Sequence, residues 1–428
     1  MIPDAIRRNT WLLFAGHVTL SVALSTGGQL SSLIVYALTG TAALAGVPSA
    51  LLSVVVATIG YPAGRMMDRR GRRPGLVVGF AVGGVGAALI GFAVAAQMFA
   101  AYLLAVVVFS AGVGIGMLSR AAVADMYPAA RRGSAVGLVV TGGLLGGISG
   151  PLLVALGDRL ARSAGWNPLA VPWVFPCVAL GAAAVILARL RPDPRDIGAR
   201  LPEYFPGTEG RVETQVPDAG GGRTAEPSVA EILATRPAQA AIVALACAQA
   251  TMIMLMATAS LMLSLHGHPI TTISFVVMAH VIGMFGLSVP VGRLADRLGR
   301  RPVLIGGALL SASSGLLFSL GVRSAVWAAA AFYLVGIGWC LAHVAGAAVL
   351  GDVSTPSTRA RVIGISDVLT NISAVVAALL AGVLLARGGE LTVGALAAVV
   401  GSVPLLAIAR AGPAPAVATA PVAEAGGR

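Results

Sequence analysis

The 428-residue sequence contains no lysine and little charge of either sign. Charged residues make up 11% of the chain, against roughly 25% in ordinary soluble domains, whereas 57% of the residues are hydrophobic. A chain with so few charged side chains cannot keep its surface solvated in water. The composition therefore excludes a soluble globular protein and predicts an integral membrane protein.

Cysteine is scarce as well: Cys177, Cys247 and Cys340 all lie in apolar segments. This placement excludes the disulfide framework of small secreted domains. The sequence has no grouping of nucleophile, base and acid that is typical of a catalytic site, and the glycine-rich GGVGAAL (83–89) lies inside an apolar run, where glycine favours helix packing. We therefore expect neither an enzyme nor a bound cofactor.

Long apolar runs are abundant instead. A run of about 20 residues can cross a hydrocarbon core roughly 30 Å thick, and the sequence has twelve such runs between residues 11 and 410. Lipid offers backbone groups no hydrogen-bonding partners, so each run must be helical. We expect an all-α integral membrane fold with twelve spans, whose main partner is the lipid bilayer.

The positions of the basic residues indicate the topology. All 29 are arginine, and if the spans alternate in direction, one side of the membrane receives every arginine except Arg159, Arg162, Arg323 and Arg387. Positive residues accumulate on the cytoplasmic side. We therefore expect the protein in the cell (cytoplasmic) membrane with both termini in the cytoplasm. The net charge of +12 then reflects topology, and we expect no nucleic-acid partner.

An internal repeat relates the two halves of the sequence. The segment PAGRMMDRRGRRPGL (62–76) recurs as PVGRLADRLGRRPVL (290–304), 228 residues later. A weaker match, at an offset of 227, relates DMYPAARRGSAVG (125–137) to DVSTPSTRARVIG (352–364). Duplicated halves are typical of transporters, whose substrate site lies near mid-membrane between them.

The repeat divides the chain into four parts. We expect six-helix bundles over residues 11–190 and 237–410. Residues 191–236, rich in charge, proline and glycine, are expected to form a solvated cytoplasmic linker with one short helix at PSVAEILATR (227–236). The low-complexity residues 411–428 predict a disordered tail.

The repeated GxxxDRxGRR, between spans 2 and 3 and again between spans 8 and 9, resembles the signature loop of the major facilitator superfamily. The resemblance implies two six-helix bundles, a central cavity, and alternation between inward-open and outward-open states. It also implies that the loop is a conformational latch whose aspartate bonds across the bundles in one state; alternatively, these charges only set the topology. The latch residues carried over are Gly64, Asp68, Arg69, Gly71, Arg72 and Arg73, and in the second copy Gly292, Asp296, Arg297, Gly299, Arg300 and Arg301.

Candidates for coupling transport to an ion gradient are His17, Arg120, Asp125 and Asp367. Since a charge near the hydrocarbon core is costly, Arg120 could serve substrate or coupling, or its side chain could extend toward Asp125 at the membrane surface. His17 could titrate near neutral pH, or it could be a packed neutral side chain. No carboxylate lies near the centre of any predicted span, which argues against a carboxylate proton relay.

Residues 251–284 hold six of the twelve methionines and three of the five histidines. Met252 and Met256 share one helix face, as do His280 and Met284. Counted at 1.5 Å per residue from the outer turn HGHP (266–269), Met256 and His280 both lie roughly 15 Å deep, and Met252 and Met284 both lie roughly 20 Å deep. Thioether and imidazole ligands suit Cu(I), so these four residues predict a metal site.

The two motifs MIMLM (252–256) and HVIGM (280–284) resemble the MxxxM and HxxxM pair in spans 7 and 8 of the CcoA-type copper importers, which belong to the same superfamily. This resemblance implies copper entry into the cytoplasm, with copper as the transported substrate and Met252, Met256, His280 and Met284 as its ligands. The alternative is that the methionines pack around a cavity for an organic substrate.

Two further groups fit a metal pathway. His266 and His268, with Met262 one turn below, could capture a metal at the outer mouth, or they could form an ordinary polar turn. Cys340 and His343 share a face of span 10 and could transfer a metal, or they could pack in the core.

Two principal functions remain open. The first is a monomeric secondary active transporter that imports Cu(I). The second is a transporter of an organic solute, either a drug-type proton antiporter or a vitamin importer. The segment GGLLGGISGPLL (142–153) partly resembles the Gly-Pro signature of drug/proton antiporters, although Leu153 and Val154 stand where that signature has glycines. A transporter-derived sensor is a third possibility, against which the two intact signature loops argue.

Overall fold

The structure is a computed structural model that describes residues 2–206, 227–321, 323–355 and 358–411. Every regular element in these ranges is a helix. Ten helical segments are long and apolar enough to cross a membrane, and the apolar segment Val171–Leu187 is shorter. One of the ten, Arg361–Ala411, turns at Gly389, where φ is +65°, and so covers the last two predicted spans. The prediction of an all-α multi-pass membrane protein is confirmed.

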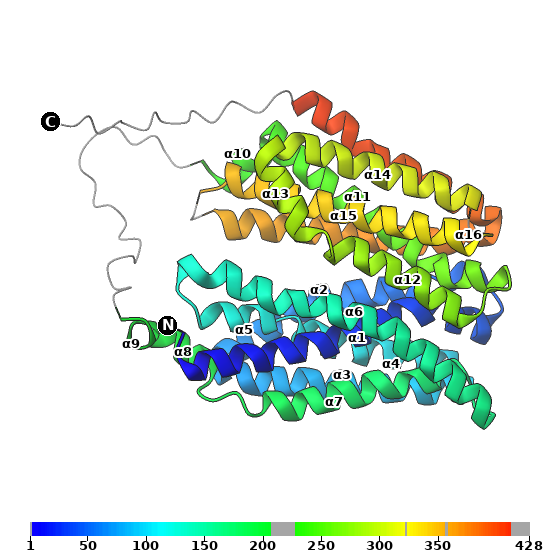
Figure 1. Cartoon of the computed structure of the whole chain (residues 1–428), viewed down its shortest axis with the longest axis horizontal. Helices are drawn as coiled ribbons and strands as arrows, with labels where there is room; N and C mark the ends of the chain where they lie inside the picture. The colour runs from blue at the N-terminus through cyan, green and yellow to red at the C-terminus, as the bar shows by residue number, and fades with distance from the viewer. Residues whose placement is uncertain (1, 207–226, 322, 356–357, 412–428) are drawn as a thin grey trace.

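The helices form two layers, which we call the N-terminal half and the C-terminal half (Figure 1). The N-terminal half contains α1 (Asp4–Thr39), η1 (Ala42–Leu44), α2 (Val47–Arg70), α3 (Arg72–Ala95), α4 (Phe99–Gly116), α5 (Ser119–Asp125), α6 (Ala129–Ala164), η2 (Val171–Trp173), α7 (Val174–Leu187), α8 (Pro194–Ala199) and α9 (Leu201–Tyr204). The C-terminal half contains α10 (Val229–Ala234), α11 (Arg236–Leu265), α12 (Ile270–Phe285), α13 (Ser288–Leu298), α14 (Arg300–Gly321), α15 (Ala325–Val353) and α16 (Arg359–Ala411).

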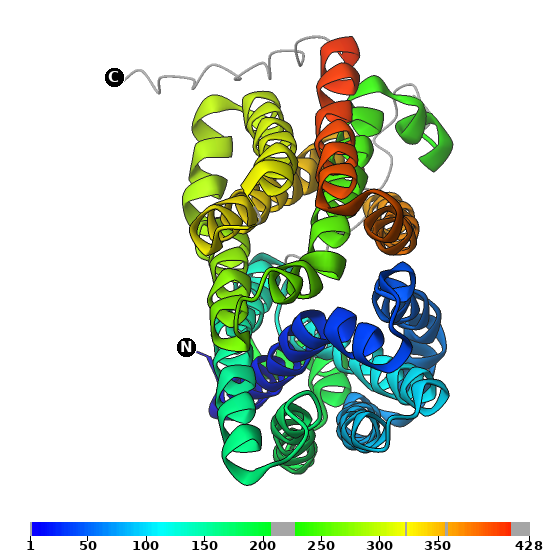
Figure 2. The same cartoon turned by 90° about the vertical axis from the view of Figure 1, so that its right-hand side faces the viewer.

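Each half has its own packing core. In the N-terminal half, α1 packs on α6 and α7, and α3 packs on α4; in the C-terminal half, α11 packs on α16 and α14 packs on α15. Figure 2, which looks along the helices, shows the two groups on separate sides of the molecule. The main contacts between the halves join α6 with α12, α2 and η1 with α16, and α1 with α11.

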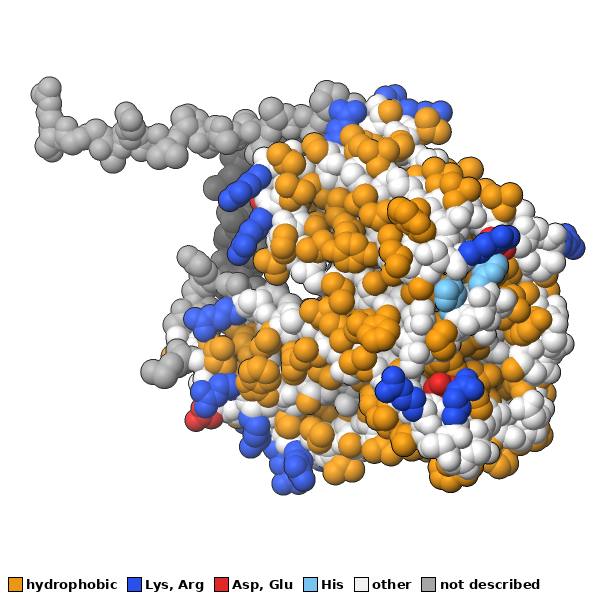
Figure 3. Space-filling model, turned by 45° about the vertical axis from the view of Figure 1, so that its right-hand side comes forward, with side chains coloured by type: hydrophobic (Ala, Val, Ile, Leu, Met, Phe, Trp, Pro, Cys, Tyr) orange, Lys and Arg blue, Asp and Glu red, His pale blue; other side chains and the backbone are white. Residues whose placement is uncertain are grey.

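Charge is concentrated at the two ends of the helices, and a broad apolar belt lies between them (Figure 3). We call the end that carries both signature loops the arginine-rich end; it lies at the left of Figure 1. The other end, with the turn at residues 266–269, is the opposite end. The belt is the surface expected to face lipid.

The expected linker is not free along its whole length. After α7 the chain turns onto the N-terminal half: Asn9 donates a hydrogen bond to the carbonyl of Pro192 at 2.9 Å, and α8 packs against α5. The short helix expected at 227–236 is present as α10, where Ser228 and Glu231 form a capping box. These bonds from Ser228 hold the pKa of Glu231 below its usual value. Residues 207–226 and the predicted tail from 412 lie outside the described residues.

The halves touch at the opposite end. Gln29 on α1 donates a buried hydrogen bond to Ser274 on α12 at 2.7 Å. Where α2 begins, a side chain at Gly46 would collide with the backbone carbonyl of Ala378 on α16. The glycine therefore allows the backbones of the two halves to meet directly.

The halves separate toward the arginine-rich end. Fourteen residues along α2 from Gly46 is Gly60, and fourteen residues back along α16 from Ala378 is Gly364; both have open space where a Cβ would lie. Fourteen residues of helix span about 21 Å, so the two glycines are level. Figure 3 shows a hollow between the halves on this side. The structure is thus closed at the opposite end and open at the arginine-rich end.

Candidate functional site

The two signature loops share one backbone conformation. Gly71, between α2 and α3, has φ +100°, and Gly299, between α13 and α14, has φ +86°. Side chains with a Cβ rarely adopt such angles. The repeated second glycine is therefore required by the turn itself, whereas the first glycines, Gly64 and Gly292, have open space around them.

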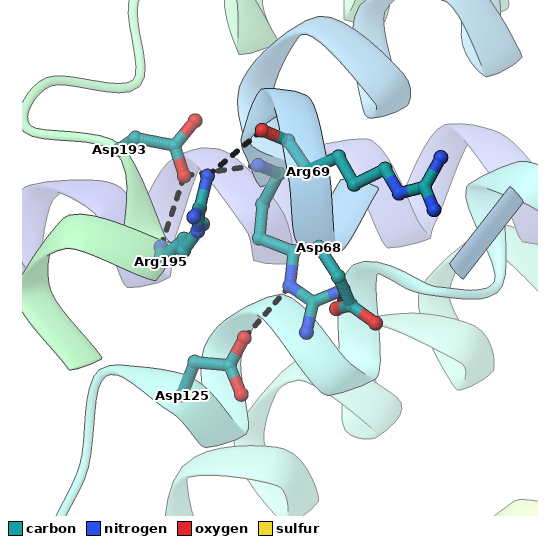
Figure 4. Close-up of polar contacts among 6 residues, drawn as sticks. Asp68, Arg69, Asp125, Asp193 and Arg195 are labelled. Carbon is teal, nitrogen blue, oxygen red and sulfur yellow. Dashed lines mark hydrogen bonds and ion pairs between the residues drawn. The ribbon is translucent and has the colours of Figure 1, made fainter. Parts of the chain in front are cut away.

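An arginine in each loop bridges two carboxylates of its own half. Arg72 pairs with Asp68 at 2.9 Å and with Asp125 at 2.8 Å. The partners of Arg300, Asp296 at 2.8 Å and Asp352 at 3.5 Å, stand at the repeat offsets of 228 and 227. Figure 4 shows the first of these networks.

These networks bear on two interpretations of the sequence. Asp125 pairs with Arg72, and among the described residues no ion pair joins Arg120 to Asp125. Among the described residues, the ion pairs of Asp68 and Asp296 stay within their own halves. The bond across the bundles that the resemblance implies would require a state in which this end is closed.

The other latch charges lie on the same surface. Arg69, Arg297 and Arg73 are exposed or half-exposed, and one side-chain nitrogen of Arg301 is buried without a hydrogen-bond partner within the described chain. All lie at the arginine-rich end, where the halves stand apart. Closure of this end would bring the charges of each loop close to the other half.

Two residues that sequence reasoning missed hold the first loop from the linker side (Figure 4). Asp193 accepts hydrogen bonds from the backbone N–H groups of Arg72 at 2.9 Å and Arg73 at 2.8 Å, at the start of α3. Arg195 donates to the carbonyl of Arg69 at 3.1 Å, at the end of α2. A carboxylate at a helix N-terminus and a cation at a C-terminus are both favourable. We call this pair the linker clamp; its sequence signal is the Asp-Pro that opens α8.

A polar group lies between the halves on the open side. His17 on α1 is buried, Arg120 on α5 is half-buried, and Asp367 on α16 is exposed. The charge of Arg120 acts on both His17 and Asp367, and thus across the two halves. In the described part of the chain, Arg120 has no ion pair within 4 Å. Counted from the middle of their spans, Arg120 and Asp367 both lie roughly 10 Å toward the arginine-rich end.

A cluster of flat side chains occupies mid-membrane depth in the C-terminal half. Trp339 on α15 donates to Gln249 on α11 at 2.7 Å, its ring lies edge-on to Phe285 at 6.2 Å, and it stacks on His343 at 3.7 Å. Gln249, Phe285 and Trp339 lie within two residues of the middle of their spans. We call these four residues the Trp339 wall. They are half-buried, so part of their surface remains available to a ligand.

The methionines of the predicted metal site adjoin this wall. Met252 belongs to the same hydrophobic core against which Met256, Met284 and Trp339 pack. Gln249, Met252 and Met256 follow one another at helical spacing on α11. Three of the four predicted ligands therefore share a core with Trp339.

The fourth predicted ligand, His280, faces α15. Its Nδ1–H donates to the carbonyl of Phe332 at 3.1 Å, which leaves Nε2 as the nitrogen with a free lone pair. Its helix, α12, packs mainly on α15 and α6, whereas α11 packs mainly on α16 and α15, and α11 and α12 touch only over a small area. The structure thus places α15 between the two pairs over much of their length.

The remaining metal-pathway candidates have other partners. His266 lies 3.5 Å from Glu390, and His268 donates to the carbonyl of Arg323 at 3.0 Å. Met262 is buried in the core of the C-terminal half. Cys340 is buried in a different core cluster, and His343 stacks on Trp339. Within the described ranges, no three His, Cys, Asp or Glu residues gather as a metal site would require.

Two bundles that carry the same repeat, in contact at one end and apart at the other, have the architecture of a membrane transporter. The sequence profile of the Major Facilitator Superfamily matches residues 12–237 and 239–426. The chain belongs to this superfamily, whose members are transporters and not enzymes.

Similar proteins agree with this assignment. The chain is 30% identical over 394 residues to the uncharacterized MFS-type transporter YdeG of Bacillus subtilis, covering 90% of this chain and 87% of YdeG. It is 26% identical over 402 residues to the riboflavin transporter RfnT of Brucella anthropi, covering 91% and 92%. Among solved structures, the partially occluded inward-open xylose transporter XylE of E. coli has a TM-score of 0.69 at 16% identity, covering 96% and 98%. This last likeness concerns the fold alone.

Proposed function

We propose that the protein is a secondary active transporter of the cytoplasmic membrane that carries an organic solute with a flat aromatic part. With the arginine-rich end in the cytoplasm, as the distribution of arginine supports, the structure is inward-facing. The solute would bind between the halves at mid-membrane depth and leave or enter through the open end.

The observation that carries this proposal is the Trp339 wall. A stacked Trp and His with an edge-on Phe offers π-faces to a flat ligand, and Gln249 adds an amide that can hydrogen-bond a polar edge. Neighbouring methionines adapt their shape to varied apolar ligands. That RfnT, a relative over almost the whole chain, is a riboflavin transporter supports a flat heteroaromatic substrate.

The charged pair supplies a gate on the open side. Arg120 and Asp367 are level, come from opposite halves and attract each other. Closing the arginine-rich end would shorten their separation and seal the path beneath the bound solute. Because this attraction is lost when the carboxylate takes up a proton, Asp367 is the group through which a proton gradient could act on this step.

The experiment that tests the proposal is uptake by cells expressing the wild type, Trp339→Leu or Trp327→Leu, with riboflavin and ethidium as flat probes. Trp327 lies on the same helix but is 56% exposed at the surface, so it is the matched control. We expect Trp339→Leu to change probe accumulation at least tenfold relative to wild type, and Trp327→Leu to leave it unchanged. Equal accumulation in all three strains and in cells without the protein would contradict the proposal.

Import of Cu(I) is the second candidate function. It is favoured by the shared core of Met252, Met256 and Met284 and by the free Nε2 of His280, since soft thioether and imidazole ligands suit Cu(I). The placement of α15 between α11 and α12 counts against it, because all four ligands must reach one ion.

Copper transport has its own test. Cellular copper would be measured for wild type, for Met252→Leu with Met284→Leu, and for the control Met254→Leu with Met278→Leu, which removes as much sulfur outside the predicted ligand set. Copper import predicts a large loss in the first double variant only. Unchanged copper uptake in that variant would eliminate this candidate.

A further inference from the structure

A cavity lies at the arginine-rich end of the N-terminal half, away from the seam between the halves. It measures about 710 Å³ and is bounded by the start of α1, the first signature loop and the chain around α8. Its charged lining comprises Arg8, Arg70, Arg73, Arg191 and Arg195, together with Asp193 and Asp196. We call it the arginine cavity.

The guanidinium groups of this cavity lack acidic partners. Among the described residues, none of the five arginines forms an ion pair within 4 Å. Of the two acids, Asp193 is occupied by the N–H groups of Arg72, Arg73 and Arg195. Five arginines against two aspartates leave a formal excess of three positive charges around one hollow. Such like charges repel one another, so an anion in the cavity would stabilise the arrangement.

Two of the arginines are held in place by the backbone. Arg8 donates to the carbonyl of Arg191, and Arg195 donates to the carbonyl of Arg69 at 3.1 Å. A guanidinium has five N–H donors in a planar fork, so each retains donors after these bonds. Forks of this kind fit the oxygens of a phosphate group, which they bind in pairs.

We propose that the arginine cavity binds a phosphate group, carried either by an anionic phospholipid of the surrounding leaflet or by a soluble phosphate ester. The cavity lies where α1, α2 and α3 leave the apolar belt, at the depth of lipid head groups. Basic pockets at this level of membrane proteins suit anionic head groups. The bound phosphate would contact the linker clamp and the signature loop together, and so would stabilise that loop. This inference does not depend on which solute the protein carries.

The test uses the full-length protein in phosphatidylcholine nanodiscs, with phosphatidylglycerol or glycerol 3-phosphate as the probe. Binding would be measured for wild type, for Arg8→Gln with Arg191→Gln, and for Arg7→Gln with Arg361→Gln, which removes equal charge outside the cavity. Arg7 is exposed and pairs with Asp4. We expect the cavity variant to bind the probe at least tenfold more weakly than wild type, and the control variant to match wild type.

The two arms distinguish the source of the phosphate. Binding of phosphatidylglycerol alone supports a lipid, whereas binding of glycerol 3-phosphate supports a soluble ester. Should the double variant not fold, Arg191→Gln alone keeps the carbonyl that accepts from Arg8 and serves in its place. The proposal is overturned if neither probe binds wild type, or if the cavity and control variants bind equally.

Discussion

Arg72 and Arg300 have the same structural role in the two halves. Each closes its loop by bridging one carboxylate on the preceding helix and one from the end of the fourth span of its half. Because these pairs lie inside each half, they can persist while the halves move. The exposed members of such networks contribute little stability singly, and their value lies in fixing the shape of the loop.

Asp193 is the residue whose loss should disturb the first loop most specifically. Asp193→Asn removes the negative charge at the N-terminus of α3, and since such a charge contributes about 0.3–1 kcal/mol, we expect a loss of stability of that order. Thermal unfolding in detergent would measure it. Asp196→Asn removes the same charge three residues away, where no hydrogen bond to α3 is present in the described structure; an equal effect of the two changes would contradict the role of Asp193.

At this scale the sequence predicted some residues and missed others. The repeat identified Asp68, Gly71, Arg72 and their copies, because identical spacing demands an identical turn. The repeat also makes Asp125 and Asp352 equivalent positions, at an offset of 227. Their arginine partners could not be predicted, because each contact joins segments that are distant in the sequence. The role proposed for Trp339 could not be predicted, since nothing in the local sequence distinguishes a tryptophan beside a binding site from one that faces lipid.

The helix pair α2 and α16 shows most clearly that the halves are in contact at one end and apart at the other. Its helices touch near Gly46 and Ala378. A Cβ at Gly382 would likewise lie only 2.6 Å from the carbonyl oxygen of Ala43. They are apart near Gly60 and Gly364. A close contact at one end and separation at the other is the arrangement expected of bundles that rock about a central site.

A wedge at the contact should reverse this arrangement. Gly46→Val places methyl groups against the carbonyl of Ala378, which should separate the opposite end and close the arginine-rich end. We expect maleimide labelling of Gly364→Cys, in a background without native cysteines, to slow about tenfold, as for a population shift of roughly 1.4 kcal/mol. The control is Gly28→Val, since Gly28 has open space around it. Equal labelling rates with and without the wedge would argue against coupling between the ends.

The spans themselves were predictable because length and apolar composition suffice to define them. Their internal breaks were not: span 4 divides into α4 and α5, and span 8 divides into α12 and α13. Apolar composition continues through both breaks, so it cannot locate them. The neighbours of α12 were likewise missed, because adjacency in sequence suggested α11 whereas packing selects α15 and α6.

At the scale of the whole molecule, three features follow one another in depth from the open end inward. The signature loops with the linker clamp lie at the surface, the Arg120 and Asp367 pair lies below them, and the Trp339 wall lies at mid-membrane depth. Toward the open end the charges of Arg120 and Asp367 act across the seam, whereas in the described structure the seam at the opposite end is closed by packing and by the hydrogen bond from Gln29 to Ser274. A solute bound to the wall in the C-terminal half would favour closure of the arginine-rich end if it also contacts the N-terminal half.

The most direct measurement of this account is the distance between spin labels at Gly60→Cys and Gly364→Cys, recorded by double electron–electron resonance with and without a solute that uptake has identified. We predict that the solute shortens this distance in the wild-type background and leaves it unchanged in the Trp339→Leu background. A distance distribution that does not respond to the transported solute in either background would contradict alternation around the Trp339 wall.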